Sequence, residues 1–171
     1  MVTHKTPYQR HTIRLPEYDY SSRGFYFVTI STQNGKHYFG EVSNAVMIVN
    51  DAGRMIERAW EALPSRFQNI STEIHKVMPN HFHGIIGINK QGYKKLGEYI
   101  GAFKSLTTKD YTFGVRNYAW EPFAKKLWNM NYYEHIIRDD DEYARIFEYI
   151  QDNALKWDAT HSEKMPWDGH L

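Results

Sequence analysis

Cysteine is the most informative absence in this 171-residue chain. Without it, the protein has no disulfide framework, no thiolate metal site and no cysteine nucleophile. Long apolar runs are missing as well, since stretches such as residues 85–88 are far too short to span a bilayer. The first residues also lack the apolar core of a signal peptide. These absences predict a cytoplasmic protein with no membrane partner.

Aromatic residues, by contrast, make up 16% of the chain, so we expect a folded globular protein. The net charge is only +1, but it is unevenly spread. Residues 89–138 carry nine Lys and Arg against four Asp and Glu, whereas residues 139–171 carry three against nine. A basic middle beside an acidic end is compatible with a polyanion bound to one face, and equally with solvated helix faces.

Strand and helix signals alternate along the chain. β-branched and aromatic residues predict strands in residues 25–32, 72–78, 81–88 and within 126–137, with a short hairpin in 37–49. Apolar residues at helical spacing predict helices in 51–63, 94–111 and 139–155, the first of them capped by Asn50. This order predicts an α+β fold of the ferredoxin-like class, a split βαβ sandwich whose antiparallel sheet has helices on one face.

His81 and His83 stand on the strand predicted for residues 81–88. Side chains alternate between the faces of a strand, so both imidazoles share one face while Phe82 points to the other. Two neutral imidazoles side by side can supply two ligands of a divalent cation. The same spacing also fits an exposed pair of strand histidines without a metal.

Tyr149 and Asn153 lie one turn apart on one flank of the last predicted helix. A tyrosine at such a position commonly packs half-buried against the core. Alternatively, the phenol is a nucleophile, and the neighbouring amide oxygen completes a metal site. Because a phenol has a pKa near 10, attack at neutral pH needs a metal ion or a similar source of positive charge at the phosphate.

The two motifs together resemble those of a known family. Val77-Met-Pro-Asn-His81-Phe-His83, followed by Tyr149-Ile-Gln-Asp-Asn153, is similar to the REP-associated tyrosine transposases. These are relatives of the single-strand insertion-sequence transposases in the HUH (His-hydrophobic-His) superfamily. Further matching segments bring the similarity to about residues 10–157: they are 14–20, 24–29, 39–40, 103–105 and 132–138.

The resemblance implies a metal-dependent endonuclease and strand transferase acting on single-stranded or hairpin DNA of the REP-palindrome kind. His81, His83 and the Asn153 side-chain oxygen would hold Mg²⁺ or Mn²⁺ against the scissile phosphate. Tyr149 would attack the phosphorus, forming a 5′-phosphotyrosine and releasing a 3′-hydroxyl that can later rejoin strands.

The resemblance also suggests how the chain is divided. Residues 1–23 would form a basic amino-terminal arm, residues 24–157 the HUH transposase-like catalytic domain and residues 158–171 an acidic carboxy-terminal tail.

The chain departs from the family pattern at one position beside the tyrosine motif. Relatives usually have proline after the asparagine, whereas Ala154 follows Asn153 here. Alanine can extend the helix past that point, so the orientation of the Asn153 side chain stays open. Gln151 is the second choice for the amide ligand, because it lies about 200° around the helix from Tyr149.

The basic middle of the chain supplies the candidate DNA contacts. Lys104 is the first choice for a phosphate contact, and simple solvation is the alternative for any lysine. In the amino-terminal arm, arginines and the rings of Tyr18 and Tyr20 suit a single strand, whose bases stack on aromatic side chains. The other candidates are Lys94, Lys95 and Lys109 in the middle, and Arg10 and Arg14 in the arm.

Two rival functions belong to different classes. A replication-initiator or relaxase-like nickase would use the same chemistry, but no further histidines stand near His83 and no helicase segment is attached. A domesticated, non-catalytic relative would keep nucleic-acid binding alone. The family includes monomers and dimers with exchanged helices, so the resemblance leaves a homodimer open.

Overall fold

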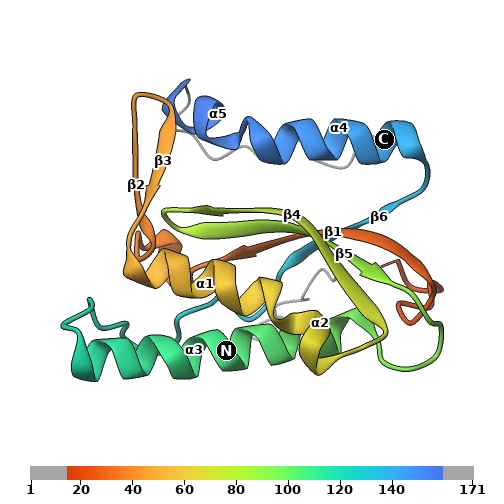
Figure 1. Cartoon of the computed structure of the whole chain (residues 1–171), viewed down its shortest axis with the longest axis horizontal. Coiled ribbons are helices and arrows are strands. Elements are labelled where there is room, and N and C mark those ends of the chain that lie inside the picture. Colours follow the sequence, from red (N-terminus) through yellow and green to blue (C-terminus); the bar gives the residue numbers. More distant parts are fainter. Residues whose placement is uncertain (1–14, 160–171) are drawn as a thin grey trace, which may run out of the picture.

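A four-stranded antiparallel sheet lies at the centre of the fold (Figure 1). The structure is a computed structural model that describes residues 15–159. The strands lie in the order β4-β5-β1-β6, with bounds β1 Gly24–Ser31, β4 Ile70–Met78, β5 His81–Ile88 and β6 Tyr133–Ile137. This is the strand order of a ferredoxin-like split βαβ sandwich, and the predicted fold class is confirmed.

Helices cover both faces of the sheet, which corrects the expectation of helices on one face only. Below the sheet in Figure 1 lie α1 (Asp51–Glu61), α2 (Leu63–Arg66) and α3 (Leu96–Asn117), and above it lies α4 (Asp140–Gln151). The cause is the composition of β1 and β5, which carry apolar side chains on both faces. Successive residues of these strands enter two separate cores, and each core needs its own helical cover.

The two cores differ in size. The smaller core lies between the sheet and α4, where Phe27 and Ile85 pack against Ile146, Tyr149 and Ile150. The larger core lies on the opposite face, against α1 and α3, and includes Tyr26, Val28, Ile30, Trp60, Phe82, Ile86 and Phe103.

The helix boundaries follow local signals with some differences. Asn50 caps α1 as predicted, because its side chain accepts a hydrogen bond of 2.9 Å from the Gly53 amide. α3 runs to Asn117 instead of ending near Tyr111, since Tyr111 and Gly114 continue its buried stripe. None of the helices between residues 15 and 159 is long and apolar enough to cross a membrane.

The last predicted helix is divided in two, which corrects the expectation of one helix over residues 139–155. α4 ends at Gln151, and a short helix, α5 (Asn153–Ala159), follows. Asp152 belongs to both hydrogen-bond series, because its amide donates to the Glu148 carbonyl (2.9 Å) and its carbonyl accepts from the Lys156 amide (3.2 Å). The backbone angles of Asp152 (φ −85°, ψ 4°) depart from helical values, so the helix is interrupted directly before Asn153, although no proline is present.

A two-stranded hairpin stands apart from the sheet at the left of Figure 1. It consists of β2 (Gly40–Ser43) and β3 (Val46–Val49), and a single 3₁₀ turn, η1 (Gln33–Gly35), precedes it. Both turn residues have positive φ, 50° at Asn44 and 60° at Ala45, as a tight two-residue hairpin requires. α5 contacts both strands of the hairpin, which thereby supports the end of the chain that carries Asn153.

Trp60 of α1 packs closely on the sheet at Gly84. Its ring is fully buried, with centroids 4.8 Å from Phe82 and 5.3 Å from Phe103. A Cβ atom on Gly84 would lie 2.8 Å from Trp60 Cζ2 and 2.9 Å from Phe82 Cε1. Such distances require the rings to shift, so the packing accommodates glycine alone at this position.

We therefore expect Gly84→Ala to lower the free energy of unfolding by about 1–3 kcal/mol, the usual cost of overpacking a core. Gly101→Ala is the matched control, because a Cβ there meets nothing within 4 Å on an exposed side of α3. It should be neutral or stabilise by about 0.5–1 kcal/mol. Urea denaturation measures both, and equal stability of the two variants would contradict the packing argument.

Candidate functional site

His83 lies in a row of side chains that crosses all four strands on the α4 face. The register pairs His83 with Lys76 of β4 and with Thr29 of β1, and pairs Thr29 in turn with Tyr133 of β6. Directly opposed residues of antiparallel strands point to the same face. His81 lies two residues before His83 and shares that face, as alternation along the strand predicts.

The two imidazole rings contact each other at the start of β5. Their Nε2 atoms are 3.0 Å apart, and their ring centroids are 4.5 Å apart. Each Nδ1 atom has a partner of its own: Asn80 Oδ1 lies 2.7 Å from His81 Nδ1, and Thr29 Oγ1 lies 2.8 Å from His83 Nδ1. These outer contacts hold both rings with their Nε2 atoms facing each other.

The partner of His81 determines which of its nitrogens carries the proton, whereas the partner of His83 does not. The Asn80 amide is oriented by its donation to the Gly35 carbonyl (3.3 Å), so its oxygen accepts from His81 Nδ1 and leaves His81 Nε2 with a lone pair. A hydroxyl both donates and accepts, so Thr29 suits either tautomer of His83. When His83 carries its proton on Nδ1, both Nε2 lone pairs are available to one ligand.

Burial keeps both imidazoles neutral. It lowers the pKa of His81 to about 4, with a hydrogen bond to Asn153 opposing the shift and the nearby His37 adding to it. Burial also lowers the pKa of His83 well below 6.5, and the charges of His81 and Lys76 add to that shift. At pH 7 both rings are therefore unprotonated, which is the state a metal ligand needs.

Tyr149 faces the histidines from the last turn of α4. Its ring centroid lies 5.5 Å from that of His83 and 6.0 Å from that of Phe27. Burial raises the pKa of the phenol, and a hydrogen bond with Asn153 lowers it in part. The Lys156 ammonium lies 4.7 Å from the ring centroid, within cation–π range. The phenol is protonated at neutral pH and needs activation to act as a nucleophile.

Asn153 joins the tyrosine to the histidines. It is the first residue of α5, is only 6% exposed, and its side chain is hydrogen-bonded with Tyr149 and with His81. Gln151, the alternative amide, is exposed. The structure therefore groups Asn153, and not Gln151, with the tyrosine and the two histidines.

The donor set of this group fits a divalent cation. Within residues 15–159, no three His, Cys, Asp or Glu side chains gather as a metal site. A site at His81 and His83 would thus need a third protein ligand of another kind, and the side chain of Asn153, which carries an amide oxygen, is hydrogen-bonded with His81. The contacts at both Nδ1 atoms are the outer partners that orient metal-binding imidazoles.

Lys76 fixes the end of α4 against the sheet. Its ammonium donates to the Gln151 carbonyl, at the negative end of the helix dipole. Burial lowers the pKa of Lys76, and the Asp152 carboxylate opposes that shift. Since Lys76 lies opposite His83 on the neighbouring strand, this contact holds Tyr149 at the level of the histidines.

Lys104 and Lys109, two of the predicted DNA contacts, lie on α3. The Lys104 ammonium donates to the carbonyls of Asn129 (2.6 Å) and Met130 (2.9 Å), so it ties α3 to the segment before β6. Burial lowers the pKa of Lys104. Lys109 is exposed. A phosphate contact by either residue stays a prediction.

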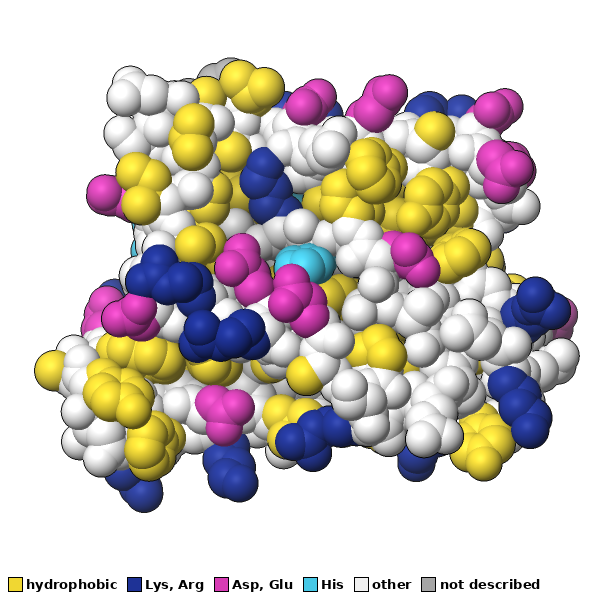
Figure 2. Space-filling view, viewed as in Figure 1, with side chains coloured by type: hydrophobic (Ala, Val, Ile, Leu, Met, Phe, Trp, Pro, Cys, Tyr) yellow, Lys and Arg dark blue, Asp and Glu magenta, His cyan; other side chains and the backbone are white. Residues whose placement is uncertain are grey.

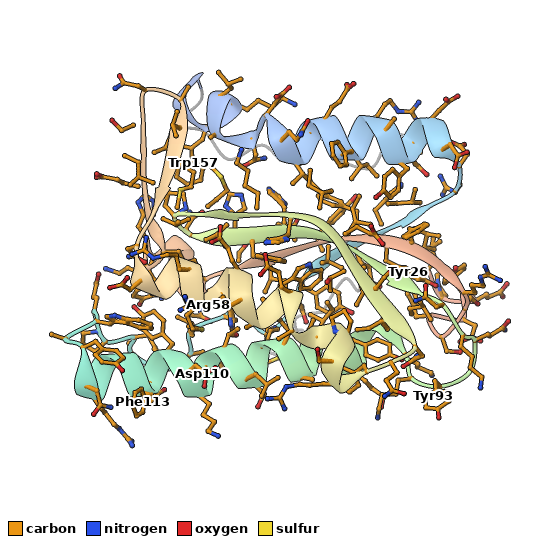
Figure 3. The ribbon with its side chains drawn as sticks, in the orientation of Figure 1. Tyr26, Arg58, Tyr93, Asp110, Phe113 and Trp157 are labelled. Carbon is orange, nitrogen blue, oxygen red and sulfur yellow. The ribbon has the colours of Figure 1, made fainter. Side chains whose placement is uncertain are left out.

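Lys94 and Lys95 are not brought near the histidines. They follow Tyr93, which lies at the opposite end of the molecule from Trp157 in Figure 3. Trp157 marks the histidine end, because its ring centroid is 5.6 Å from that of His81. Contacts by this lysine pair would therefore require DNA that extends across the molecule.

The amino-terminal arm is described only in part. Arg10 and Arg14 lie outside the described residues. Tyr18 and Tyr20 pack edge to face, with centroids 5.0 Å apart, and the Tyr18 hydroxyl is 3.1 Å from that of Tyr26. Both rings pack against the larger core. These two side chains, which the sequence predicts to stack on bases, therefore have a structural role in the fold.

Three residues of the site were missed from the sequence: Thr29, Asn80 and Trp157. Asn80 stands directly before His81, so the motif itself could have indicated it. Thr29 has no local signal, because only the pairing of β1 with β5 brings it to His83. The ring of Trp157 lies beside that of His81 because α5 carries it there.

The depressed pKa values of the histidines make stability dependent on pH. The unfolded state binds protons on these rings more readily than the folded state, so acid favours unfolding. Well above pH 6.5, His81 should not make stability depend on pH. As the pH falls from 6.5 to about 4, we expect His81 to lower the free energy of unfolding. Below about pH 4 it should cause no further change. His83 adds a loss in the same direction.

Replacing both histidines with glutamine should flatten this part of the curve. Urea denaturation at a series of pH values, with the wild-type chain and the double variant in parallel, measures the difference. Parallel curves between pH 6.5 and 4 would show that the rings protonate freely in the folded state.

Comparison with known proteins gives the chain its relatives, although no family model matches it. A Haemophilus influenzae protein described only as uncharacterized is 36% identical over 172 residues, which cover 88% of this chain and 91% of that protein. The solved structure of a REP-associated tyrosine transposase bound to a REP hairpin has a TM-score of 0.63 at 18% identity, covering 85% of this chain and 74% of that one. A Deinococcus radiodurans protein provisionally assigned as a transposase has a TM-score of 0.48 at 16% identity, with 77% and 91% covered. The chain therefore belongs to the same family as the Haemophilus protein, and its fold is that of a REP-associated tyrosine transposase.

Proposed function

We propose that this chain is a metal-dependent transposase and endonuclease with a tyrosine nucleophile, which binds single-stranded or hairpin DNA, cleaves it and rejoins strands. The observation that carries the proposal is the grouping of Tyr149, His81 and His83 around the Asn153 side chain. A nucleophile beside a pair of metal-binding side chains is what phosphoryl transfer requires. The shared fold with a transposase solved on a REP hairpin supports the same substrate class.

Tyr149 supplies the nucleophile in this proposal. Its phenol oxygen attacks the phosphorus of the scissile phosphodiester, the bond from phosphorus to the 3′ oxygen breaks, and a 5′-phosphotyrosine forms. The phenol gives up one proton and the departing 3′ oxygen gains one, so the step balances. The phosphotyrosine ester retains the energy of the broken linkage. A 3′-hydroxyl can therefore reverse the step and join strands without a nucleotide cofactor.

His81, His83 and Asn153 would hold Mg²⁺ or Mn²⁺. When bound, the ion withdraws charge from the phosphate, which is Lewis-acid catalysis. Two imidazoles and one amide are neutral donors and leave the ion its full charge. Burial keeps the imidazoles neutral. Burial also raises the pKa of the phenol, and the hydrogen bond with Asn153 offsets only part of that rise, so the phenol depends on the charge of the ion for its activation.

Tyr149→Phe removes the nucleophile while preserving the packing of the ring on Phe27. We expect loss of the covalent protein–DNA adduct by about 10³-fold or more, with hairpin binding unchanged. The full chain is incubated with Mn²⁺ and a hairpin oligonucleotide that has single-stranded flanks and a label at its 3′ end, since the 3′ segment stays on the tyrosine. A denaturing gel then detects the adduct.

Tyr143→Phe is the matched control, because Tyr143 lies on the same helix and packs on Phe25 with centroids 5.4 Å apart. This variant should form the adduct at the wild-type rate. Undiminished cleavage by Tyr149→Phe would remove Tyr149 from the mechanism, with Tyr143 as the next candidate. DNA binding by the wild-type chain without any adduct would favour a non-catalytic DNA-binding protein.

The contact between Thr29 and His83 predicts a role in metal binding. Thr29→Val keeps the shape and strand preference of the side chain but removes the hydroxyl that holds His83 Nδ1. We expect Mn²⁺ affinity to fall by about 10–100-fold, the usual effect of losing such a partner. Thr29→Ser retains a hydroxyl and should restore most of the affinity.

Electron paramagnetic resonance of free Mn²⁺ during titration measures both affinities, and thermal melts establish that each variant is folded. Equal Mn²⁺ affinity of the valine variant and the wild-type chain would contradict the assignment of His83 as a ligand.

A further inference from the structure

A groove of about 850 Å³ opens beside the candidate site. Its floor includes Thr29 and Ser31 of β1 and Tyr133 of β6, which lie on the same face of the sheet as the histidines. Its walls come from the turn around Asn34 and from residues 124–132. The groove is thus formed where the sheet extends beyond the part that α4 covers.

Thr29 makes the groove continuous with the histidine pair. Thr29 borders the groove although it is only 2% exposed, and its hydroxyl is 2.8 Å from His83 Nδ1. Ser31, the next residue of the floor, lies opposite His81 in the register. A strand whose phosphate lies beside His81 could therefore continue into the groove across Ser31.

The charged side chains that line the groove are all positive. Lys36, Lys125 and Lys126 line it, and no Asp or Glu does. All three lysines are exposed, and within residues 15–159 none of them has a salt-bridge partner. The face shown in Figure 2 differs, because basic and acidic side chains lie interspersed on it.

A second hollow extends the basic surface. It measures about 470 Å³, lies along the same segment, and shares Lys125 and Lys126 with the groove. Lys104 and Lys109 line it as well, again without an acidic residue. The two hollows together form a track that leads from Thr29 across the two adjacent lysines to α3.

We propose that this groove binds the single-stranded DNA that continues from the scissile phosphate, with Lys36, Lys125 and Lys126 contacting its backbone. The proposal rests on the proposed function, since it places the substrate of that site. Uniform positive charge matches a phosphate backbone. Tyr132 and Tyr133 also line the groove and provide aromatic surface for unpaired bases, which a duplex keeps stacked inside.

The test measures binding in the Tyr149→Phe background, so that no cleavage occurs. Fluorescence anisotropy compares a hairpin with a single-stranded flank and the same hairpin without one. The double variant K125Q/K126Q should weaken binding of the flanked hairpin by about tenfold or more. The slope of log K against log salt concentration should also become less steep by about 1.4, which is the value for two phosphate contacts to a single strand. Binding of the hairpin without a flank should not change.

R66Q/K90Q is the matched control, because it removes the same charge from two exposed basic side chains that are not among the predicted DNA contacts. It should bind the flanked hairpin as the parent does. Equal losses in both double variants, or a loss in K125Q/K126Q that does not depend on the flank, would overturn the groove assignment. These results are independent of the adduct assay: failure to form an adduct refutes the proposed chemistry, whereas unchanged binding by K125Q/K126Q refutes the groove alone.

Discussion

The antiparallel pairing of β1 with β5 is the constraint on which the candidate site depends. It sets Thr29 opposite His83 and Ser31 opposite His81, so the register determines both the partner of one imidazole and the floor of the adjoining groove. A shift by one residue would turn every side chain of β1 to the other face. Apolar residues on both faces of β1 oppose such a shift, because each core would lose its match with the helices that cover it.

The position of Tyr149 depends on a second constraint, the end of α4. The Lys76 ammonium donates a hydrogen bond to the Gln151 carbonyl. α4 ends there, and Asn153 starts a new helix after Asp152. One lysine of the sheet thereby determines where the helix stops and where the amide side chain lies. The hairpin β2–β3 supports the other side of α5. The amide is therefore held from two directions, although Ala154 and not a proline follows it.

Local patterns predicted much of this arrangement. Alternation along a strand put His81 and His83 on one face, and helical spacing put Tyr149 near Asn153. Other features depend on contacts between distant segments, which no local pattern contains. The cover of α4 on the second face, the carbonyl contacts of Lys104 and the hydroxyl of Thr29 beside His83 all belong to this class. Lys125 and Lys126 were counted in the basic middle, but only the folded sheet turns their segment into the wall of a groove.

The order of the elements along the chain has a consequence for biosynthesis. β5, which carries both histidines, precedes β6 and α4 in the chain, so both imidazoles are synthesised before the phenol. A nascent chain that ends before α4 therefore contains both imidazoles but lacks Tyr149. Asn153 comes later still, at the start of α5, so the full grouping of imidazoles, phenol and amide exists only once α4 and α5 are in place.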